Sequence, residues 1–202
     1  MELETRGFYL ADRLEVREDG REITGQFPYA KRAGEGPMAV VADRGPNRKE
    51  QFAPHAFRYA IEDETREIQL LFGHNPNTPL ARRNNGTFEL EDTDDALRFR
   101  AVLPPLNEQP SYMRDVLMQI RAGLIPGVSP GFRIPPAAAV ANAVEMIDEP
   151  GNPGVKIRWI TAAVLYELSL VSRPAYEGDD NTVDVRTAIG SQTVSLPRRY
   201  WL

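Results

Sequence analysis

Short strand-like segments joined by turn sequences fill most of the first 171 residues, and few stretches have the period of a helix. In each segment apolar and polar side chains alternate, and a turn sequence such as Asp19-Gly20 or Pro150–Gly154 separates one segment from the next. Alternation on both sides of a tight turn is typical of a β-hairpin. Three pairs of segments have this pattern: residues 13–17 with 22–27, 87–90 with 96–102, and 144–147 with 155–159.

One stretch has clear helical periodicity. Four apolar residues at spacings of three and four define one face of a helix: Met113, Val116, Leu117 and Ile120. Ser111 is the expected N-cap, and Gly123 is the expected C-terminal stop. The apolar face has two possible uses, packing on the core of the same chain or self-association, and core packing is favoured. A shorter helix is expected after Pro54.

The remaining apolar runs predict further strands. Residues 67–72 and 163–171 are expected to form buried strands. Residues 124–134 contain two prolines and Gly131, which favours a bent or edge strand over a central one. The sum is a mainly β fold with helices (α+β), in which a closed or half-closed barrel carries one or two helices.

The chain is expected to hold one folded domain. We expect an N-terminal extension at residues 1–11, a domain at 12–176 and a polar, flexible C-terminal tail at 177–202. No run of 18 or more apolar residues is present, so no membrane association is expected.

Composition limits the chemistry. The net charge of −5 gives no strong electrostatic reason to bind nucleic acid. The chain has no cysteine, which excludes disulfides, thiolate catalysis and cysteine-bound zinc. Its two histidines are far apart without a metal-binding spacing, so no metal or cofactor is expected. Any catalysis must then use an oxygen nucleophile or paired carboxylates.

Three polar residues stand at unusual places in this pattern. His74 ends an apolar run, and histidine is the usual general base near neutral pH. Ser129 lies between glycines 127 and 131, which would let a substrate carbonyl approach an exposed hydroxyl, although serines are also common in turns. Glu167 lies inside an apolar strand and therefore needs a partner, either an arginine or an imidazole N–H. A base, a hydroxyl and a carboxylate are the components of a serine hydrolase.

The order of these motifs carries a family resemblance. Gly73-His74-Asn75, then Gly127–Phe132, then Glu167–Ala175 resemble the HK97-like family of phage prohead (capsid maturation) proteases. The resemblance covers residues 12–176. Within it, Glu50–Phe57 is similar to a family segment in which glycine is usual at the position of His55, so His55 is not expected to be catalytic.

The resemblance implies a fold similar to the herpesvirus assemblin proteases, a β-barrel surrounded by a few helices. It also implies a serine endopeptidase that acts in the host cytoplasm inside the procapsid. Its substrates would be the scaffold protein and the scaffold-like region of the major capsid protein. Self-cleavage and self-association are expected as well.

Carried over from the family, the catalytic roles fall on three residues of this chain. Ser129 is the nucleophile, His74 the base and Glu167 the residue that orients the imidazole. Backbone N–H groups around Ser172 and Arg173 would form the oxyanion hole. Ser169 and Ser172 are rival hydroxyls. The alternatives to an active protease are a catalytically silent capsid-assembly or scaffolding module of the same fold, and a generic β-barrel binding protein with Glu167 paired to arginine.

Overall fold

The computed structural model describes residues 4–5, 15–16, 21–36, 39–40 and 48–172. Within these residues the chain forms thirteen strands and two helices. In chain order they are β1 (Glu4–Thr5), β2 (Glu15–Val16), β3 (Glu22–Pro28), β4 (Ala39–Val40), β5 (Arg48–Phe52), α1 (Arg58–Ile61), β6 (Gln69–Phe72), β7 (Asn75–Arg82), β8 (Phe88–Asp92), β9 (Ala96–Val102), α2 (Ser111–Arg121), β10 (Gly127–Arg133), β11 (Val144–Asp148), β12 (Lys156–Ile160) and β13 (Val164–Val171).

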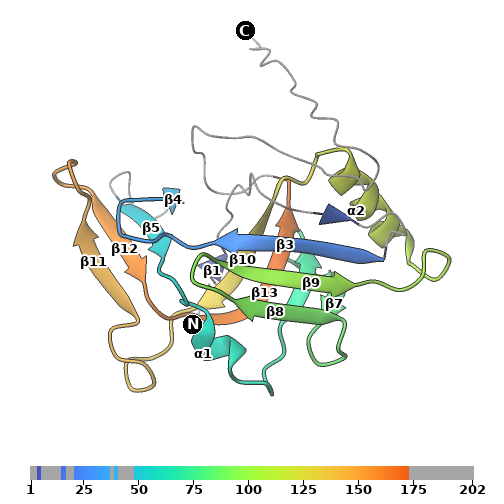
Figure 1. Ribbon diagram of the computed structural model, residues 1–202, viewed down its shortest axis with the longest axis horizontal. Helices are drawn as coiled ribbons and strands as arrows, with labels where there is room; N and C mark the ends of the chain where they lie inside the picture. Colours follow the sequence, from blue (N-terminus) through green and yellow to red (C-terminus); the bar gives the residue numbers. More distant parts are fainter. Residues whose placement is uncertain (1–3, 6–14, 17–20, 37–38, 41–47, 173–202) are drawn as a thin grey trace, which may run out of the picture.

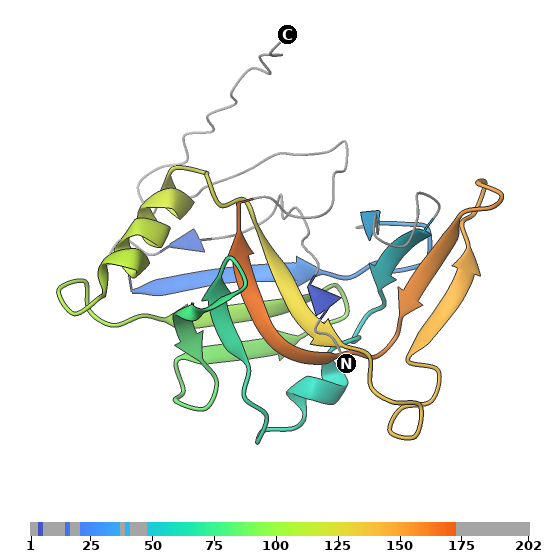
Figure 2. The same cartoon turned by 180° about the vertical axis from the view of Figure 1, so that it is seen from behind.

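The strands form three sheets. The largest has the order β1-β10-β13-β6-β7, and the other two have the orders β2-β3-β9-β8 and β11-β12-β5-β4. In Figure 1 the β2-β3-β9-β8 sheet lies in front of the five-stranded sheet, and the β11-β12-β5-β4 sheet projects to one side. Figure 2 gives the opposite view, in which β10 and the strongly curved β13 lie in front.

One apolar core joins the five-stranded sheet to the β2-β3-β9-β8 sheet. Strand β3 alternates buried and partly exposed residues, so one of its faces is turned inward. Inward side chains of both sheets belong to the same cluster: Ile23, Phe27, Leu97 and Phe99 from β3 and β9, and Leu70, Val128, Phe132, Leu165 and Leu168 from β6, β10 and β13. The five-stranded sheet is therefore held on one face by the sheet that packs against it.

An aromatic cluster extends this core toward β5 and α1. The ring of Phe52 lies 5.0 Å from the rings of both Phe57 and Phe132, and 5.4 Å from the ring of Phe27. Aromatic pairs at these separations add to the stabilisation that burial alone provides. Phe52 belongs to β5, and Phe132 belongs to β10. The cluster therefore connects the β11-β12-β5-β4 sheet and α1 to the strand that carries Ser129.

The mainly β class with a few helices is confirmed. Hairpins β8–β9 and β11–β12 form as predicted, and β2 pairs with β3, although the predicted Asp19-Gly20 turn lies outside the described residues. The strands that the structure describes are divided among three sheets, and no closed barrel is detected among them.

Helix α2 also forms as predicted, with one difference at its start. Met113, Val116, Leu117 and Ile120 are buried in the core cluster, so core packing is the use that this face has within the chain. Pro110 rather than Ser111 is the N-cap, because Ser111 already has helical geometry and no side chain caps the first turn. Gly123 follows the helix with φ +70°, as a C-terminal stop requires.

The prediction that β10 is an edge strand is wrong. The strand does not lie at an edge, because β1 pairs with one side of it and β13 with the other. The expected bend is present as a shift of register between Gly131 and Phe132. Its other unusual residue, Pro130, is accommodated inside the sheet opposite Leu168.

Strands β5 and β7 had no clear signal in the sequence. Strand β7 contains Pro76 and Pro79, which argue against a strand, but it lies at an edge of the sheet where missing N–H groups are tolerated. Neither helix in the described part of the chain is long and apolar enough to cross a membrane. The predicted tail at 177–202 lies outside the described residues.

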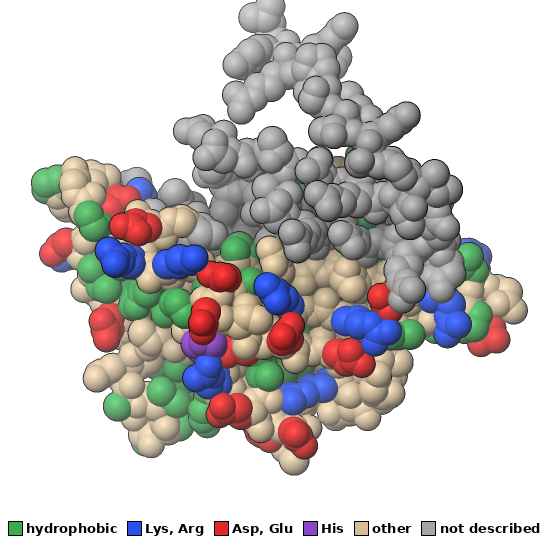
Figure 3. All heavy atoms as spheres, viewed as in Figure 1, with side chains coloured by type: hydrophobic (Ala, Val, Ile, Leu, Met, Phe, Trp, Pro, Cys, Tyr) green, Lys and Arg blue, Asp and Glu red, His purple; other side chains and the backbone are tan. Residues whose placement is uncertain are grey.

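The surface in front of β3, β8 and β9 mixes charges. Figure 3 shows acidic and basic side chains interspersed over this face. Arg100 is an example, because its guanidinium pairs with Glu22 at 2.6 Å and with Glu89 at 3.2 Å. Charges arranged in this way largely neutralise one another.

Candidate active site

Three neighbouring strands of the five-stranded sheet bring the sequence-predicted residues together. Ser129 lies on β10, Glu167 lies on β13, and His74 follows β6. Strand β13 lies between the other two, antiparallel to β10 and parallel to β6. The three side chains, which are up to 93 residues apart in sequence, therefore meet at the middle of one sheet.

His74 occupies a tight turn. Gly73 and His74 form the two-residue connection between β6 and β7, with φ +62° and +57°. Positive φ at both central residues is typical of a type I′ hairpin turn. The Gly73 N–H donates to the carbonyl of Leu170 at 3.0 Å, and the His74 N–H donates to Ser169 Oγ at 2.9 Å. The turn is thus bound to β13 as well as to its own hairpin.

The imidazole of His74 contacts the other two residues, one with each nitrogen. Nδ1 lies 2.6 Å from Glu167 Oε1, and Nε2 lies 2.8 Å from Ser129 Oγ. An ionised carboxylate can only accept a hydrogen bond, so the proton of a neutral imidazole belongs on Nδ1. Nε2 is then the acceptor for the Ser129 hydroxyl. The three side chains form one continuous chain of hydrogen bonds.

Glu167 has the imidazole as its partner, not an arginine. Within the described part of the chain, its one ion pair is with His74. Its second oxygen, Oε2, accepts a hydrogen bond from Ser169 Oγ at 2.7 Å. Both carboxylate oxygens are therefore satisfied, although the side chain is buried.

The backbone of β10 leaves room for this carboxylate. Gly131 stands opposite Glu167 in the antiparallel pair. A Cβ atom at residue 131 would lie 2.2 Å from Glu167 Oε1, which is far inside van der Waals contact. A glycine is required at this position because the carboxylate fills the space that a side chain would take.

Ser129 differs from its prediction in one respect. The sequence suggests an exposed hydroxyl, but Ser129 is 1% exposed because β10 is buried along most of its length. Ser169 is also buried, and Ser172 is exposed just after β13. Arg173, the other residue of the predicted oxyanion hole, lies outside the described residues.

A cleft opens beside the imidazole. It has a volume of about 360 Å³ and is lined by Glu67, Gln69, Leu71, His74, Pro76, Tyr166 and Glu167. Gln69 and Leu71 come from β6 and lie opposite Glu167 and Ser169 of β13. The guanidinium of Arg133 lies over the ring of Tyr166, 5.3 Å from the ring centre, and forms a cation–π contact with it. The cleft gives a ligand direct access to His74 and Glu167.

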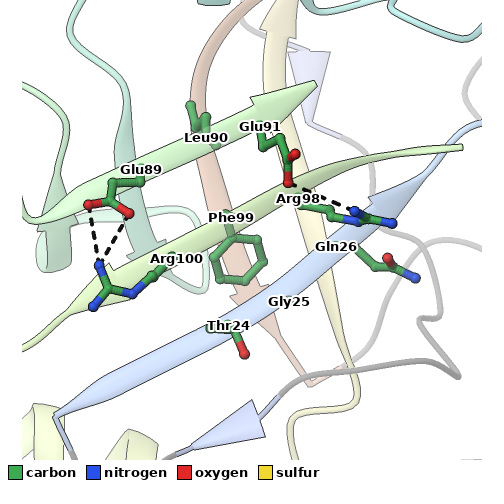
Figure 4. A pocket seen from close by; sticks show the side chains of 9 residues that line it. All are labelled: Thr24, Gly25, Gln26, Glu89, Leu90, Glu91, Arg98, Phe99 and Arg100. Carbon is green, nitrogen blue, oxygen red and sulfur yellow. Dashed lines mark hydrogen bonds and ion pairs between the residues drawn. The ribbon is translucent and has the colours of Figure 1, made fainter. Parts of the chain in front are cut away.

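A larger hollow lies on the outer surface of the β2-β3-β9-β8 sheet. It has a volume of about 620 Å³ and is lined by Thr24, Gly25, Gln26, Glu89, Leu90, Glu91, Arg98, Phe99 and Arg100. Figure 4 shows its ionic side chains paired across the strands, Arg98 with Glu91 and Arg100 with Glu89. It contains neither a histidine nor a serine, so its lining lacks the Ser–His pair of a serine hydrolase.

The second histidine has a different environment. His55 Nδ1 lies 2.8 Å from Asp92 Oδ2, and Nε2 lies 2.7 Å from Asp94 Oδ1. Hydrogen bonds to Asp92 and then Asp94, together with the charge of Asp92, raise the pKa of His55. Asp92 also accepts a hydrogen bond from the hydroxyl of Tyr29, and burial raises the pKa of that phenol. His55 therefore ties α1 to the β8–β9 hairpin rather than to the site around His74.

Comparison with known proteins decides the family. A family model described as caudovirus prohead serine protease matches residues 36–193. The chain belongs to this family. Among solved structures, the bacteriophage T4 capsid assembly protease is similar, with 14% identity, a TM-score of 0.43, and coverage of 83% of this chain and 97% of that chain. No curated protein matches the sequence significantly.

Membership makes this protein a serine protease of phage head maturation and confirms the resemblance drawn from its motifs. The matched region contains His74, Ser129 and Glu167. His55 has φ +61°, a conformation that glycine adopts without strain.

Two residues of the candidate site had no role assigned to them from the sequence. Ser169 stood only as a rival hydroxyl, and Gly131 only as a flexible neighbour of the serine. Alternation along β13 already puts Glu167 and Ser169 on one face. The contact between Gly131 and Glu167 depends on the pairing of β10 with β13, which no local pattern reveals.

Proposed function

We propose that this prohead protease cleaves peptide bonds with a Ser129–His74–Glu167 triad. The observation that carries the proposal is the chain of hydrogen bonds from Ser129 Oγ through the His74 imidazole to Glu167, at 2.8 and 2.6 Å. Both distances fall in the range required for proton transfer between a nucleophile and its base.

In the proposed reaction, His74 Nε2 takes the proton of Ser129 as Oγ attacks the scissile carbonyl carbon. The carbonyl π electrons move to oxygen and form an oxyanion. His74 then gives the proton to the leaving amine as the C–N bond breaks, which leaves an acyl group on Ser129. Water repeats the sequence and releases the acid. Glu167 holds the Nδ1–H and stabilises the imidazolium in both halves.

The oxyanion requires preorganised N–H donors. We assign them to the backbone after β13, around Ser172 and Arg173. This segment follows β13 directly, and β13 pairs with the Ser129 strand through Gly127 and Val171. Donors at that end of β13 would approach the carbonyl from the nucleophile's side.

Substrate access is part of the proposal. The cleft beside His74 would take a side chain next to the scissile bond, since it reaches the imidazole and has both apolar and polar walls. Because Ser129 is 1% exposed, its surroundings must open for a peptide to reach Oγ.

The biological substrates follow from the family. We propose that the protease acts inside the procapsid, in the host cytoplasm, on the scaffold protein and the scaffold-like region of the major capsid protein. Self-cleavage, with residues 177–202 as a natural target, and self-association complete the proposal. Confinement in the shell would restrict cleavage to these partners.

The first test compares intact mass against time for the wild-type protein and Ser129→Ala at high concentration. Fragments from wild type alone are expected, and their masses identify the cleavage sites. A fluorophosphonate probe adds a direct readout, because it should label wild type at Ser129 and leave Ser129→Ala unlabelled. Labelling at another serine, or equal proteolysis by both proteins, contradicts the proposed nucleophile.

Coexpression with scaffold and capsid protein tests the substrates. Wild type should trim both inside assembled shells, and Ser129→Ala should assemble into shells that keep full-length proteins. Shells that mature normally with Ser129→Ala would contradict the proposed role. Ser111→Ala is the matched serine control, since Ser111 is exposed at the start of α2 and has no role in the proposed reaction.

A further inference from the structure

The hydroxyl of Ser169 joins the backbone of His74 to the carboxylate of Glu167. Ser169 Oγ lies 2.9 Å from the His74 nitrogen and 2.7 Å from Glu167 Oε2. The residue is fully buried on β13. With the bond between His74 Nδ1 and Glu167 Oε1, these contacts close a ring that contains only three residues.

The direction of each hydrogen bond in this ring is fixed by chemistry. A backbone N–H can only donate, so Ser169 Oγ accepts from His74. An ionised carboxylate can only accept, so the Ser169 hydroxyl donates to Glu167. Serine satisfies both demands with a single oxygen. Alanine would satisfy neither, and it would leave a buried N–H and a buried carboxylate oxygen without a protein partner.

The conformation of His74 explains why its backbone needs this contact. A non-glycine residue with φ of +57° is strained, and such a residue persists only where its surroundings hold it. Apart from its hairpin, the turn is held by the bond from Gly73 to Leu170 and the bond from His74 to Ser169. Loss of the second bond frees the peptide that carries the imidazole.

We propose that Ser169 is a positioning residue for catalysis, which holds the base and the orienting carboxylate in register with each other. This inference rests on the proposed Ser129–His74–Glu167 triad. The geometry does not favour Ser169 as an alternative nucleophile, because Nε2 of the imidazole contacts Ser129 Oγ and Ser169 binds the opposite side of the triad.

The first experiment measures the rate at which a fluorophosphonate labels Ser129 in wild type, Ser169→Ala and Ser169→Thr. Ser169→Ala should label about 10–100-fold more slowly, the loss expected from one or two buried hydrogen bonds. Ser169→Thr keeps the hydroxyl and should recover a large part of the rate.

The second experiment needs no catalytic activity. The chain has two histidines, so NMR can follow the ring N–H proton of each imidazole in the folded protein. In Ser169→Ala the signal of the His74 Nδ1 proton should weaken and exchange faster with solvent, because the backbone of His74 and the carboxylate of Glu167 are no longer held together. His55, bound to Asp92 and Asp94, is the internal control, and its signals should not change.

The outcomes separate the two proposals. If Ser129→Ala labels or cleaves like wild type, or if wild type does not label, the triad is wrong, and the NMR comparison still decides whether Ser169 acts on His74. If labelling depends on Ser129 but Ser169→Ala matches wild type in rate and in the His74 ring-proton signal, only the role of Ser169 is overturned. A slower rate with an unchanged His74 signal in a folded protein would likewise overturn it, because a packing defect elsewhere predicts that result.

Discussion

Gly131 and Glu167 face each other across β10 and β13 so closely that a Cβ atom on residue 131 would lie 2.2 Å from Oε1 of the carboxylate. Gly131→Ala should therefore displace Glu167 from His74 without substituting any residue of the proposed triad. Misorienting the imidazole in this way should lower kcat/KM by about 10²–10⁴-fold. The measurement is the rate of cleavage or of fluorophosphonate labelling against wild type.

A matched glycine separates this contact from the general effect of losing a glycine. Gly86→Ala introduces a Cβ atom that meets nothing within 4 Å, although it strains a turn with φ +73°. It should lower stability slightly and leave the rate unchanged. Equal rates for Gly131→Ala and wild type would mean that Glu167 has no orienting role.

The losses of rate caused by two single substitutions in the proposed triad should not add when the substitutions are combined. Ser129→Ala and His74→Ala should each lower the rate by about 10⁴–10⁶-fold, and the double variant should be no slower than the worse single variant. Glu167→Gln should cost less, because it removes neither the nucleophile nor the base. The measurement is the single-turnover cleavage rate of each single variant and of the double variant. Additive losses of rate would show that the residues act independently.

The His55 cluster predicts a pH-dependent stability. A histidine whose pKa is raised on folding stabilises the fold below its unfolded value of about 6.5, and this contribution is lost as the pH rises through the raised value. As the pH rises above about 6.5, the unfolding free energy should therefore fall more steeply in wild type than in His55→Gly. Urea titrations across this range provide the measurement.

Glycine is the suitable replacement for His55 because it suits the backbone conformation of this residue. His55 has φ +61°, a conformation that glycine adopts readily, so the variant should fold and relieve backbone strain. His74 is present in both proteins and contributes equally. Identical pH dependence in the two proteins would mean that the bonds to Asp92 and Asp94 do not persist in solution.

The aromatic cluster predicts a large stability effect away from the site. Phe52 is buried against Phe27, Phe57 and Phe132. Phe52→Ala should lower the unfolding free energy by about 3–5 kcal/mol, as measured by denaturant titration. Met118→Ala, at a helix position that is 64% exposed, should change it by less than about 0.5 kcal/mol. Similar effects at both positions would contradict the description of the core.

Local patterns predicted the parts of the fold that local chemistry determines. The β8–β9 and β11–β12 hairpins and helix α2 follow from alternation, turn residues and helical spacing. Strand β7 did not, because its prolines are tolerated only at a sheet edge, and edge position is a property of the whole sheet. The edge prediction for β10 failed for the same reason, since its neighbours come from both ends of the chain.

Part of the candidate site could likewise be predicted from local sequence, and part could not. Ser129, His74 and Glu167 could be named because each residue type is unusual where it stands in the sequence. The choice between imidazole and arginine as the partner of Glu167 could not be made, since it depends on the parallel pairing of β13 with β6. Burial of Ser129 was also missed, because flanking glycines indicate open backbone but say nothing of the strands on either side.

The position of β13 has a consequence for when the site can form. This strand is the last one the structure describes along the chain, yet it lies between the nucleophile strand β10 and the histidine strand β6. During synthesis, Ser129 and His74 leave the ribosome with no strand between them to hold them together. The site is completed only when residues 164–171 have emerged and inserted. The same strand carries Glu167, so a nascent chain has neither the complete set of proposed catalytic residues nor their geometry until this segment has been made.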